Sequence, residues 1–207
     1  MIIGILGQMR TGKTSLARQI KSEMEEQFPN GCFIHSFAEP LRTECALTFF
    51  GEHYRPHPSP RTAWDVAEAT NKEVCRPILQ AIGEGKRRLL GRDYWVNKVK
   101  EWASYLPTSP DHLIIMDDVR HENEARWILE NNGIIIRLTA DRKTLIERGA
   151  SEERLAHYSE TAMIQRSAVE KEYAHRCLAM RTNGLSPAGV LKGLRRFIEE
   201  LLWGEEE

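Results

Sequence analysis

Short apolar runs alternate along the chain with longer stretches in which apolar residues recur every three or four positions. The first run, at residues 2–6, is rich in β-branched side chains and ends at Gly7. A short apolar run bounded by glycine is typical of a buried strand, whereas the wider spacing is typical of an amphipathic helix. The sequence therefore predicts a strand, a loop and then a helix whose apolar face comprises Leu16, Ile20, Met24 and Phe28.

Four later apolar runs predict four more strands, at 32–37, 113–116, 134–138 and 177–180. Helices are predicted between these strands and after the last one. One begins after Pro40, one has Pro77 in its first turn, and one follows Asp93 as its N-cap. Two more are predicted at 125–133 and from Pro187 onward. Strands that alternate with helices indicate a parallel, doubly wound α/β sheet. The proline-rich segment 52–61 fits neither pattern, so we expect an insertion or a mobile loop there.

Composition narrows the class of protein. The chain has 207 residues, of which 41% are hydrophobic and 29% charged, as in an ordinary globular domain. Its formal net charge of -1 excludes a general attraction to nucleic acid or to an anionic membrane, so any anion site must be local. The four cysteines form no C-x-x-C pair and are expected to be reduced, buried thiols. The apolar N-terminus lacks a basic leader and is interrupted by Gly4 and Gly7, which favours a strand and a cytoplasmic protein.

The loop after the first strand contains a phosphate-binding motif. Residues 7–14 are Gly-Gln-Met-Arg-Thr-Gly-Lys-Thr and satisfy G-x-x-x-x-G-K-[ST] between a predicted strand and a predicted helix. Glycines let backbone N–H groups face a polyphosphate, Lys13 supplies a point charge, and the Thr14 hydroxyl can bind magnesium. A glycine-rich turn with a solvated lysine is the plain alternative. The predicted nucleotide-binding residues are Gly7, Met9, Arg10, Thr11, Gly12, Lys13, Thr14 and Ser15.

A pair of carboxylates, Asp117 and Asp118, closes the third predicted strand. A carboxylate at that strand end can hold magnesium opposite Thr14. Adjacent strand residues point to opposite faces, so only one of the two can serve the metal directly. The alternative is that the pair caps the following helix, and one residue could do so while the other serves the metal.

Residues 118–125, Asp-Val-Arg-His-Glu-Asn-Glu-Ala, resemble the D-V-R-x-x-N-E-A signature of phage-type deoxynucleoside monophosphate kinases. Further segments resemble pieces of that family in the same order, over nearly the full chain. They are 36–42 (F-A-x-P-L-[KR]), 79–83 (L-Q-x-[IL]-G), 93–96 (D-x-W-V), 159–161 (S-E-T) and 182–184 (N-[DG]). The segment 52–61 matches nothing in the family, and the doubled acid before Val119 departs from its pattern. On motif register, the resemblance favours Asp118 as the metal carboxylate.

The resemblance implies one P-loop kinase domain over residues 1–207, with five parallel strands flanked by helices. It also implies a helical acceptor-binding insertion at about 40–106 and a lid at about 141–160 that closes over bound phosphates. Asn183 becomes a candidate for nucleotide binding, and the implied location is the cytoplasm of a phage-infected host cell. The candidate acceptor-binding residues are Phe37, Arg42, Arg76, Gln80, Trp95 and Arg120.

Two of these candidates have a second interpretation. Gln80 can donate to and accept from a nucleobase edge, but an amide can equally cap a helix. Trp95 could stack on a base, although it shares a helical stripe with Val99 and Leu106, which favours packing in the core.

Phosphoryl transfer requires positive charge around the transferring group, so arginines are expected at the site. Arg148 and Arg154 fall in the implied lid, and each arginine could instead be solvated or paired with a nearby glutamate. The predicted catalytic residues are Lys13, Asp118, Arg120, Arg148 and Arg154.

Three functions are compatible with these motifs. The first is transfer of the ATP γ-phosphate to a deoxynucleoside 5'-monophosphate, a small-molecule partner, with Mg2+ as the required ion. The second is phosphorylation of a hydroxymethylated pyrimidine base in phage DNA, whose backbone the basic stretch 85–92 with Lys98 and Lys100 could bind. The third is a nucleotide-switch ATPase module that controls a partner. No membrane partner is expected, and the sequence allows either a monomer or a homodimer.

Overall fold

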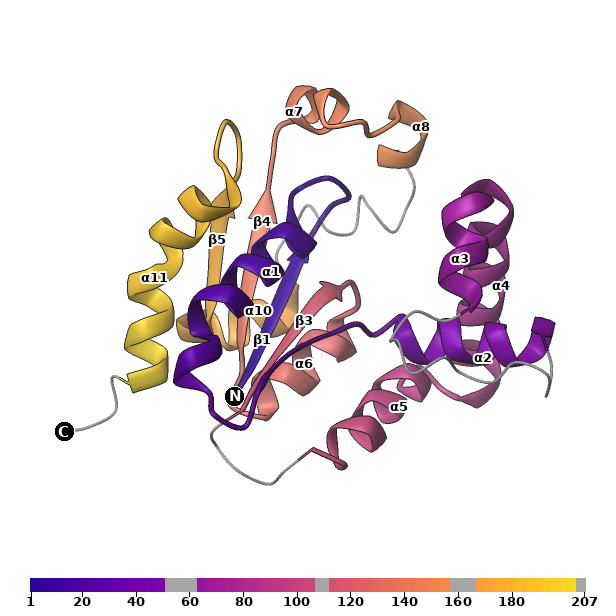
Figure 1. Ribbon diagram of the computed structural model, residues 1–207, viewed down its shortest axis with the longest axis horizontal. Helices are drawn as coiled ribbons and strands as arrows, with labels where there is room; N and C mark the ends of the chain where they lie inside the picture. Colours follow the sequence, from indigo (N-terminus) through magenta and orange to yellow (C-terminus); the bar gives the residue numbers. More distant parts are fainter. Residues whose placement is uncertain (51–62, 107–111, 157–166, 204–207) are drawn as a thin grey trace. The chain divides into compact units, whose positions relative to one another are not determined.

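The computed structural model describes residues 1–50, 63–106, 112–156 and 167–203 (Figure 1). The chain forms two compact units, one from residues 1–36 and 107–207 and the other from residues 37–106. The second unit nearly coincides with the insertion that the sequence predicts at about 40–106. The proline-rich segment 52–61 lies outside the described residues.

One parallel sheet forms the centre of the first unit. Its strands are β1 (Ile2–Gly7), β2 (Cys32–His35), β3 (Leu113–Val119), β4 (Ile134–Thr139) and β5 (Cys177–Arg181), in the order β2-β3-β1-β4-β5. Every neighbouring pair is parallel, and Ile3 of β1 lies opposite Ile115 on one side and Ile134 on the other. The predicted five-stranded parallel sheet is therefore confirmed. Because the strands run the same way, the residues that follow them meet at one edge of the sheet.

Helices cover both faces of this sheet. α1 (Lys13–Met24) and α11 (Pro187–Trp203) lie on one face, and α6 (Glu122–Glu130) and α10 (Ala168–Glu172) lie on the other. The short helices α7 (Arg142–Glu147) and α8 (Glu152–Leu155) come after β4, beyond the ends of the strands (Figure 1). Two short helical turns are η1 (Glu25–Gln27) and η3 (Ala174–Arg176). Leu16 of α1 and Leu194 of α11 share an apolar core with Ile3 and Ile115 on one face. On the opposite face, Ile128 of α6 packs over β1 at Gly4, where a Cβ atom would lie only 2.6 Å from the isoleucine.

In the described part of residues 37–106, the chain forms α2 (Glu39–Phe50), α3 (Ala63–Thr70), α4 (Lys72–Leu90) and α5 (Tyr94–Ala103). Trp95 is 1% exposed, and its indole N–H donates to the Gly83 carbonyl oxygen at 3.0 Å. Glu44 of α2 accepts a hydrogen bond from the Tyr94 hydroxyl and pairs with Lys86 at 3.1 Å. These contacts join α2, α4 and α5 into one packed unit.

Two details of the predicted helices are wrong. Pro77 lies inside α4, which begins at Lys72, and not in a first turn. An interior proline removes one backbone hydrogen bond, but Cys75 beside it is buried against α2, and this packing supports the turn before the proline. Asp93 does precede α5, but its side chain makes no capping hydrogen bond.

The four cysteines are buried thiols outside any disulfide, as predicted. Burial raises the pKa of Cys32 and of Cys45 to about 11, so both stay protonated at neutral pH. Within the described residues, no helix is both long enough and apolar enough to cross a membrane.

Candidate functional site

The loop between β1 and α1 turns sharply, and its glycines explain how. A Cβ atom on Gly7 would lie 2.5 Å from the carbonyl oxygen of Leu138, so only glycine allows β1 and β4 to approach this closely. Gly12 has φ 98°, a left-handed conformation that favours glycine, and it occupies the N-cap of α1. Arg10 has φ 63°, so the middle of the loop is left-handed as well. This path leads the loop around the start of α1, where the first backbone N–H groups have no partner within the helix.

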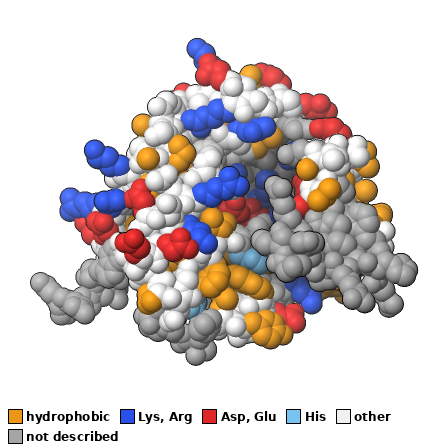
Figure 2. All heavy atoms as spheres, viewed as in Figure 1, with side chains coloured by type: hydrophobic (Ala, Val, Ile, Leu, Met, Phe, Trp, Pro, Cys, Tyr) orange, Lys and Arg blue, Asp and Glu red, His pale blue; other side chains and the backbone are white. Residues whose placement is uncertain are grey.

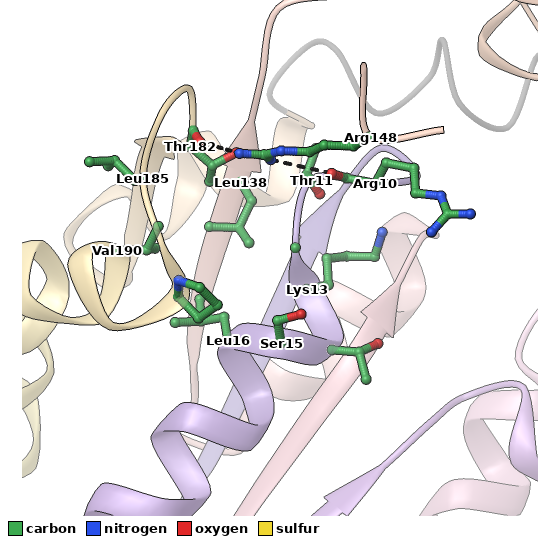
Figure 3. A pocket seen from close by; sticks show the side chains of 13 residues that line it. Arg10, Thr11, Lys13, Ser15, Leu16, Leu138, Arg148, Thr182, Leu185 and Val190 are labelled. Carbon is green, nitrogen blue, oxygen red and sulfur yellow. Dashed lines mark hydrogen bonds between the residues drawn. The ribbon is translucent and has the colours of Figure 1, made fainter. Parts of the chain in front are cut away.

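Lys13 extends back over the loop that precedes it (Figure 3). Its Nζ donates to the carbonyl oxygens of Gly7 at 2.8 Å and Gln8 at 2.9 Å. Thr11 is 1% exposed, and its hydroxyl donates to the same Gln8 oxygen at 2.8 Å. These two acceptors are neutral carbonyls, and a polyphosphate oxygen would be a stronger acceptor than either of them.

The two carboxylates at the end of β3 have different partners. The Thr14 hydroxyl donates to Oδ2 of Asp117 at 2.7 Å, whereas the Ser36 hydroxyl, just after β2, donates to Oδ2 of Asp118 at 2.5 Å. Motif register favours Asp118 as the metal carboxylate, but the structure places Asp117 beside the threonine of the loop motif. Of the two carboxylates, Asp117 is therefore the one that faces Thr14.

The pairing of β3 with β1 is irregular beside these two carboxylates. Gly4 pairs with Met116 and Leu6 with Val119, so β3 advances three residues while β1 advances two. Such a β-bulge turns side chains away from strict alternation. Alternation alone would put Val119 on the face of Asp117, yet Val119 lies on the α6 face, 3.2 Å from where a Cβ atom of Gly4 would be. Asp117 comes before this change of face. Leu113 and Ile115 lie in the core on the α1 face, so alternation along β3 already directs Asp117 to that face, where Thr14 lies.

His35, the last residue of β2, lies within electrostatic range of Asp118. Burial lowers the pKa of His35 to about 4, and the negative charge of Asp118 opposes this shift only in part. The imidazole is therefore neutral at physiological pH and contributes no positive charge to the site.

A pocket of about 430 Å³ lies between the loop and the segment that joins β5 to α11 (Figure 3). Such a volume is within the range of small-molecule sites. One end carries the loop residues Thr11, Gly12, Lys13, Thr14 and Ser15. The other end is apolar and is lined by Leu138, Leu185, Pro187 and Val190. A polar end next to an apolar one suits an anionic group attached to a flat ring system.

Arg148 forms part of the pocket wall. Its Nη1 donates to the Arg10 carbonyl oxygen at 3.3 Å and to Oγ1 of Thr182 at 3.1 Å, and its Nη2 donates to the Thr182 carbonyl oxygen at 2.6 Å. Next to it, the Asn183 side chain accepts from the Asp141 backbone N–H at 3.0 Å and donates to the Asp141 carboxylate. Asn183, predicted to bind nucleotide, thus uses its side chain to hold the residue that precedes α7.

Arg120 follows β3 and is half-buried. The backbone N–H groups of Arg120 and His121 donate to one oxygen of Glu124, at 2.8 Å and 3.0 Å. Glu124 itself is 3% exposed. The glutamate of the D-V-R-x-x-N-E-A signature therefore orders the backbone turn that carries Arg120.

Positive side chains gather around the pocket. Arg10, Lys13 and Arg148 all line it. On the face drawn in Figure 2, blue Lys and Arg side chains lie over the part of the molecule where Figure 1 shows α7 and the loop after β1. The side chain of Arg154 in α8, expected in the lid, and the S-E-T segment 159–161 lie outside the described part of the structure.

The acceptor candidates of the second unit differ in exposure. Arg42 is paired with carboxylates of α3, Glu68 at 3.3 Å and Asp65 at 4.0 Å. Arg76 is half-buried and Gln80 is exposed, one turn apart on α4. These three polar side chains remain candidates for ligand contact.

Phe37 and Trp95 are buried and do not fit the predicted role in ligand binding. Phe37 is 3% exposed and Trp95 is 1% exposed. The indole N–H of Trp95 is also used by a backbone carbonyl of α4. The burial of Trp95 agrees with its second interpretation, packing in the core, and the burial of Phe37 leaves little of its ring for a ligand.

Comparisons with known proteins find similarity in structure but not in sequence. No protein-family model matches the chain, and no curated protein matches it. Shikimate kinase from Aquifex aeolicus vf5 is 11% identical, with a TM-score of 0.49 and 96% of each chain covered. A gluconokinase from Sinorhizobium meliloti 1021 is 15% identical, with a TM-score of 0.48 and coverage of 99% of this chain and 97% of that one. At these values, the activity and the acceptor have to be argued from the site itself.

Three residues of the site are absent from the sequence-based candidates: Ser36, Thr182 and Glu124. Ser36 and Thr182 directly follow β2 and β5 in the structure. The apolar runs predict strands at 32–37 and 177–180, so Ser36 falls inside a predicted strand and Thr182 two residues beyond one. Glu124 belongs to the signature, and its buried carboxylate gives it a structural role that the motif alone does not reveal.

Proposed function

We propose that this protein is a P-loop kinase that transfers the γ-phosphoryl group of ATP to a deoxynucleoside 5'-monophosphate, yielding the diphosphate. The observation that carries the donor half of this proposal is that Lys13 and Thr14 lie together at the polar end of one pocket, with Asp117 bonded to the Thr14 hydroxyl. The acceptor half rests on the order of the signature segments in the sequence.

The donor site follows from the chain's own groups. The N-terminus of α1 and the left-handed loop before it offer backbone N–H groups to the polyphosphate. Lys13 would exchange the carbonyls of Gly7 and Gln8 for phosphate oxygens and so bring its charge onto the β- and γ-phosphates. The apolar end with Leu185 and Val190 is suited to the base.

Thr14 and Asp117 suit Mg2+, because a hydroxyl and a carboxylate oxygen 2.7 Å apart are hard oxygen ligands. The described residues contain no cluster of three or more His, Cys, Asp or Glu side chains that could hold a metal ion. Water and phosphate oxygens would therefore complete the coordination, as Mg2+ generally prefers. When bound, the ion neutralises charge on the β- and γ-phosphates.

On the acceptor side, arginine matters more than a general base. A monophosphate is already an anionic nucleophile, so the protein has to position it and offset its charge. Arg120 is suited to this role because Glu124 orders its backbone. Arg42 is held by Glu68 and Asp65, and a phosphate would compete with these carboxylates for its guanidinium group.

The alternative acceptor, a modified base within DNA, is less well supported. Its proposed backbone-binding stretch carries Lys86, Arg88 and Lys98. Each forms an ion pair with a glutamate, at 3.1, 3.0 and 3.3 Å respectively. A cation that is already paired with a carboxylate contributes less to binding the DNA backbone. These ion pairs therefore favour a free nucleotide over DNA as the substrate. A nucleotide-switch ATPase would need no acceptor groups at all.

Product analysis tests the proposal. The protein is incubated with MgATP and each deoxynucleoside monophosphate in turn, and separately with duplex DNA containing hydroxymethylated pyrimidines. We expect one dNDP formed for each ADP. Lys13→Met should lower the rate by about a hundredfold or more. Lys21→Met, which alters a half-buried lysine on the same helix that pairs with Glu25 at 3.7 Å, should not lower it. Labelled DNA, or inorganic phosphate alone, would refute the proposed acceptor.

A further inference from the structure

We propose that Arg148 is a positioning residue of the donor site, which holds the loop between β1 and α1 and the segment after β5 in one fixed arrangement. The inference rests on the proposed function, because the pocket that it stabilises is the one assigned there to ATP. It replaces the expectation that Arg148 moves with a lid and contacts the transferring phosphoryl group.

The contacts of Arg148 bridge two segments that are far apart in the sequence. One arm of its guanidinium group donates to the carbonyl oxygen of Arg10, in the loop after β1, at 3.3 Å. Both arms donate to Thr182, which directly follows β5, at 3.1 Å and 2.6 Å. Figure 3 shows the guanidinium group lying between these partners along one side of the pocket. The polar end and the apolar end of the pocket are thereby connected through one side chain.

Arg10, the partner of Arg148 in the loop, has an unusual backbone conformation. Arg10 has φ 63°, a left-handed conformation that is unfavourable for a residue with a side chain. A carbonyl that is held on one side of a planar peptide directs the following N–H group to the other side. The bond from Arg148 therefore stabilises a strained turn and fits the direction of the next N–H group, that of Thr11, which donates to the Gln8 carbonyl oxygen at 3.4 Å.

The helix that carries Arg148 is attached to the same segment at its other end. Asp141, the N-cap of α7, accepts hydrogen bonds from the side chains of Asn183 and Arg181. Its backbone N–H donates to Asn183 at 3.0 Å. Because α7 is held at both ends by residues 181–183, we assign α7 to the wall of the pocket and not to a moving lid.

Apolar contacts also hold α7 against the loop between β1 and α1. Leu145 of α7 forms a small buried cluster with Ala150 and Leu155, and Met9 of the loop packs against this cluster. The Arg148 hydrogen bonds thus add direction to a contact that the hydrophobic cluster already maintains. This also explains how Met9, predicted to bind nucleotide, contributes through its side chain: it seats the loop on α7.

A positioning role can be distinguished from a role of charge alone. The planar guanidinium group donates to three acceptors on two segments. A lysine ammonium at the same place keeps the charge but cannot donate to all of these acceptors at once. The loss of affinity for the nucleotide should therefore be similar for Arg148→Lys and Arg148→Met. Thr182→Val removes one of the acceptors without any change of charge and so acts on the same bridge.

The test measures the Kd of a non-hydrolysable ATP analogue with Mg2+ by calorimetry, together with the melting temperature of each variant. We expect Arg148→Lys and Arg148→Met to raise the Kd by about tenfold or more, with little change in melting temperature. Thr182→Val should raise the Kd of the wild type but not that of Arg148→Met. Arg126→Met, which breaks exposed ion pairs with Glu130 and Glu172, should leave the Kd unchanged.

Two results would overturn the inference while leaving the proposed function intact. One is an Arg148→Lys variant that binds the analogue as tightly as the wild type does. The other is a Thr182→Val substitution that changes the Kd by the same factor in the wild type and in Arg148→Met. If Arg148→Met does not fold, the same cycle is run with Arg148→Lys. A wild-type protein that does not bind the analogue would overturn the proposed function and this inference together.

Discussion

Arg137 of β4 and Glu170 of α10 form a buried ion pair, and its disruption should destabilise the protein strongly. Nε of Arg137 donates to Oε1 of Glu170 at 2.8 Å, and Nη2 donates to Oε2. The two side chains are 5% and 0% exposed. Glu170 also accepts from the Ser167 backbone N–H at 2.9 Å, as part of the capping box of α10. Arg137→Met would leave this carboxylate buried without its cation.

The expected loss can be worked out from this burial. Removal of one partner from a buried, hydrogen-bonded ion pair destabilises a protein by about 3–5 kcal/mol. With a urea m-value of about 2 kcal/mol/M, the unfolding midpoint should fall by about 2 M. The double variant Arg137→Met with Glu170→Leu removes the stranded charge and should recover most of this loss, apart from about 1 kcal/mol for the missing helix cap.

The loss of stability in Arg137→Met should also depend on pH, and its direction follows from the pKa of Glu170. Burial by itself raises the pKa of Glu170, but hydrogen bonds from Arg137 and Ser167 outweigh burial and hold the pKa below its usual value of 4.5. In the wild type, this stabilisation is present above pH 4.5 and is lost as the pH falls through the lowered pKa. Without Arg137, burial dominates and the pKa rises, so protonation relieves the buried charge. The difference in stability between variant and wild type should therefore shrink as the pH is lowered from 7 toward 4.5.

Urea unfolding followed by circular dichroism at pH 7 and pH 5 measures both effects. Arg195→Met serves as the control, because it removes an exposed pair with Glu23 and should change stability by at most about 1 kcal/mol. An Arg137→Met variant within about 1 kcal/mol of the wild type at pH 7 would refute the assignment of a buried, paired charge.

Two further predictions concern the edge of the sheet. Because burial lowers the pKa of His35 from 6.5 to about 4, the unfolded chain binds the proton first, and stability should fall by up to about 3 kcal/mol as the pH drops from 6.5 to 4. His35→Asn should flatten this part of the stability profile in urea unfolding, and an unchanged profile would contradict the prediction. Gly7→Ala places a Cβ atom 2.5 Å from the Leu138 carbonyl oxygen and should lower stability by about 1–3 kcal/mol and weaken ATP binding. Gly85→Ala, in an open helical position of α4, should instead raise stability by up to about 1 kcal/mol, and equal effects of the two substitutions on melting temperature would show that the close approach is unimportant.

The strands and the phosphate-binding loop are predictable from the sequence because their determinants are local. Apolar runs next to glycine specify the strands whatever surrounds them. In the loop, Gly7 and Gly12 occupy positions where a side chain would clash or strain the backbone, so the residue types themselves report the geometry. Lys13 and Thr14 then follow at fixed places at the start of α1.

The candidates that fail do so where side-chain direction depends on distant neighbours. Trp95 has a residue type and a spacing compatible with either packing or stacking, and only the carbonyl of Gly83 identifies it as a core residue. Pro77 suits a first turn by its own preference, but packing around Cys75 extends α4 upstream of it. Local preference is a matter of about 1–3 kcal/mol, which burial of neighbouring side chains readily offsets.

The sequence by itself therefore determined the parallel sheet, the phosphate-binding loop and the presence of a carboxylate at the end of β3, because each depends on a few adjacent residues. Tertiary structure alone decided that Ser36 bonds to Asp118, since β2 and β3 become neighbours only in the folded sheet. It also decided the place of Arg148, whose partners lie 138 and 34 residues away in the chain. Contacts of this kind form only when separate strands are brought to the same edge of the sheet, and no local pattern encodes them.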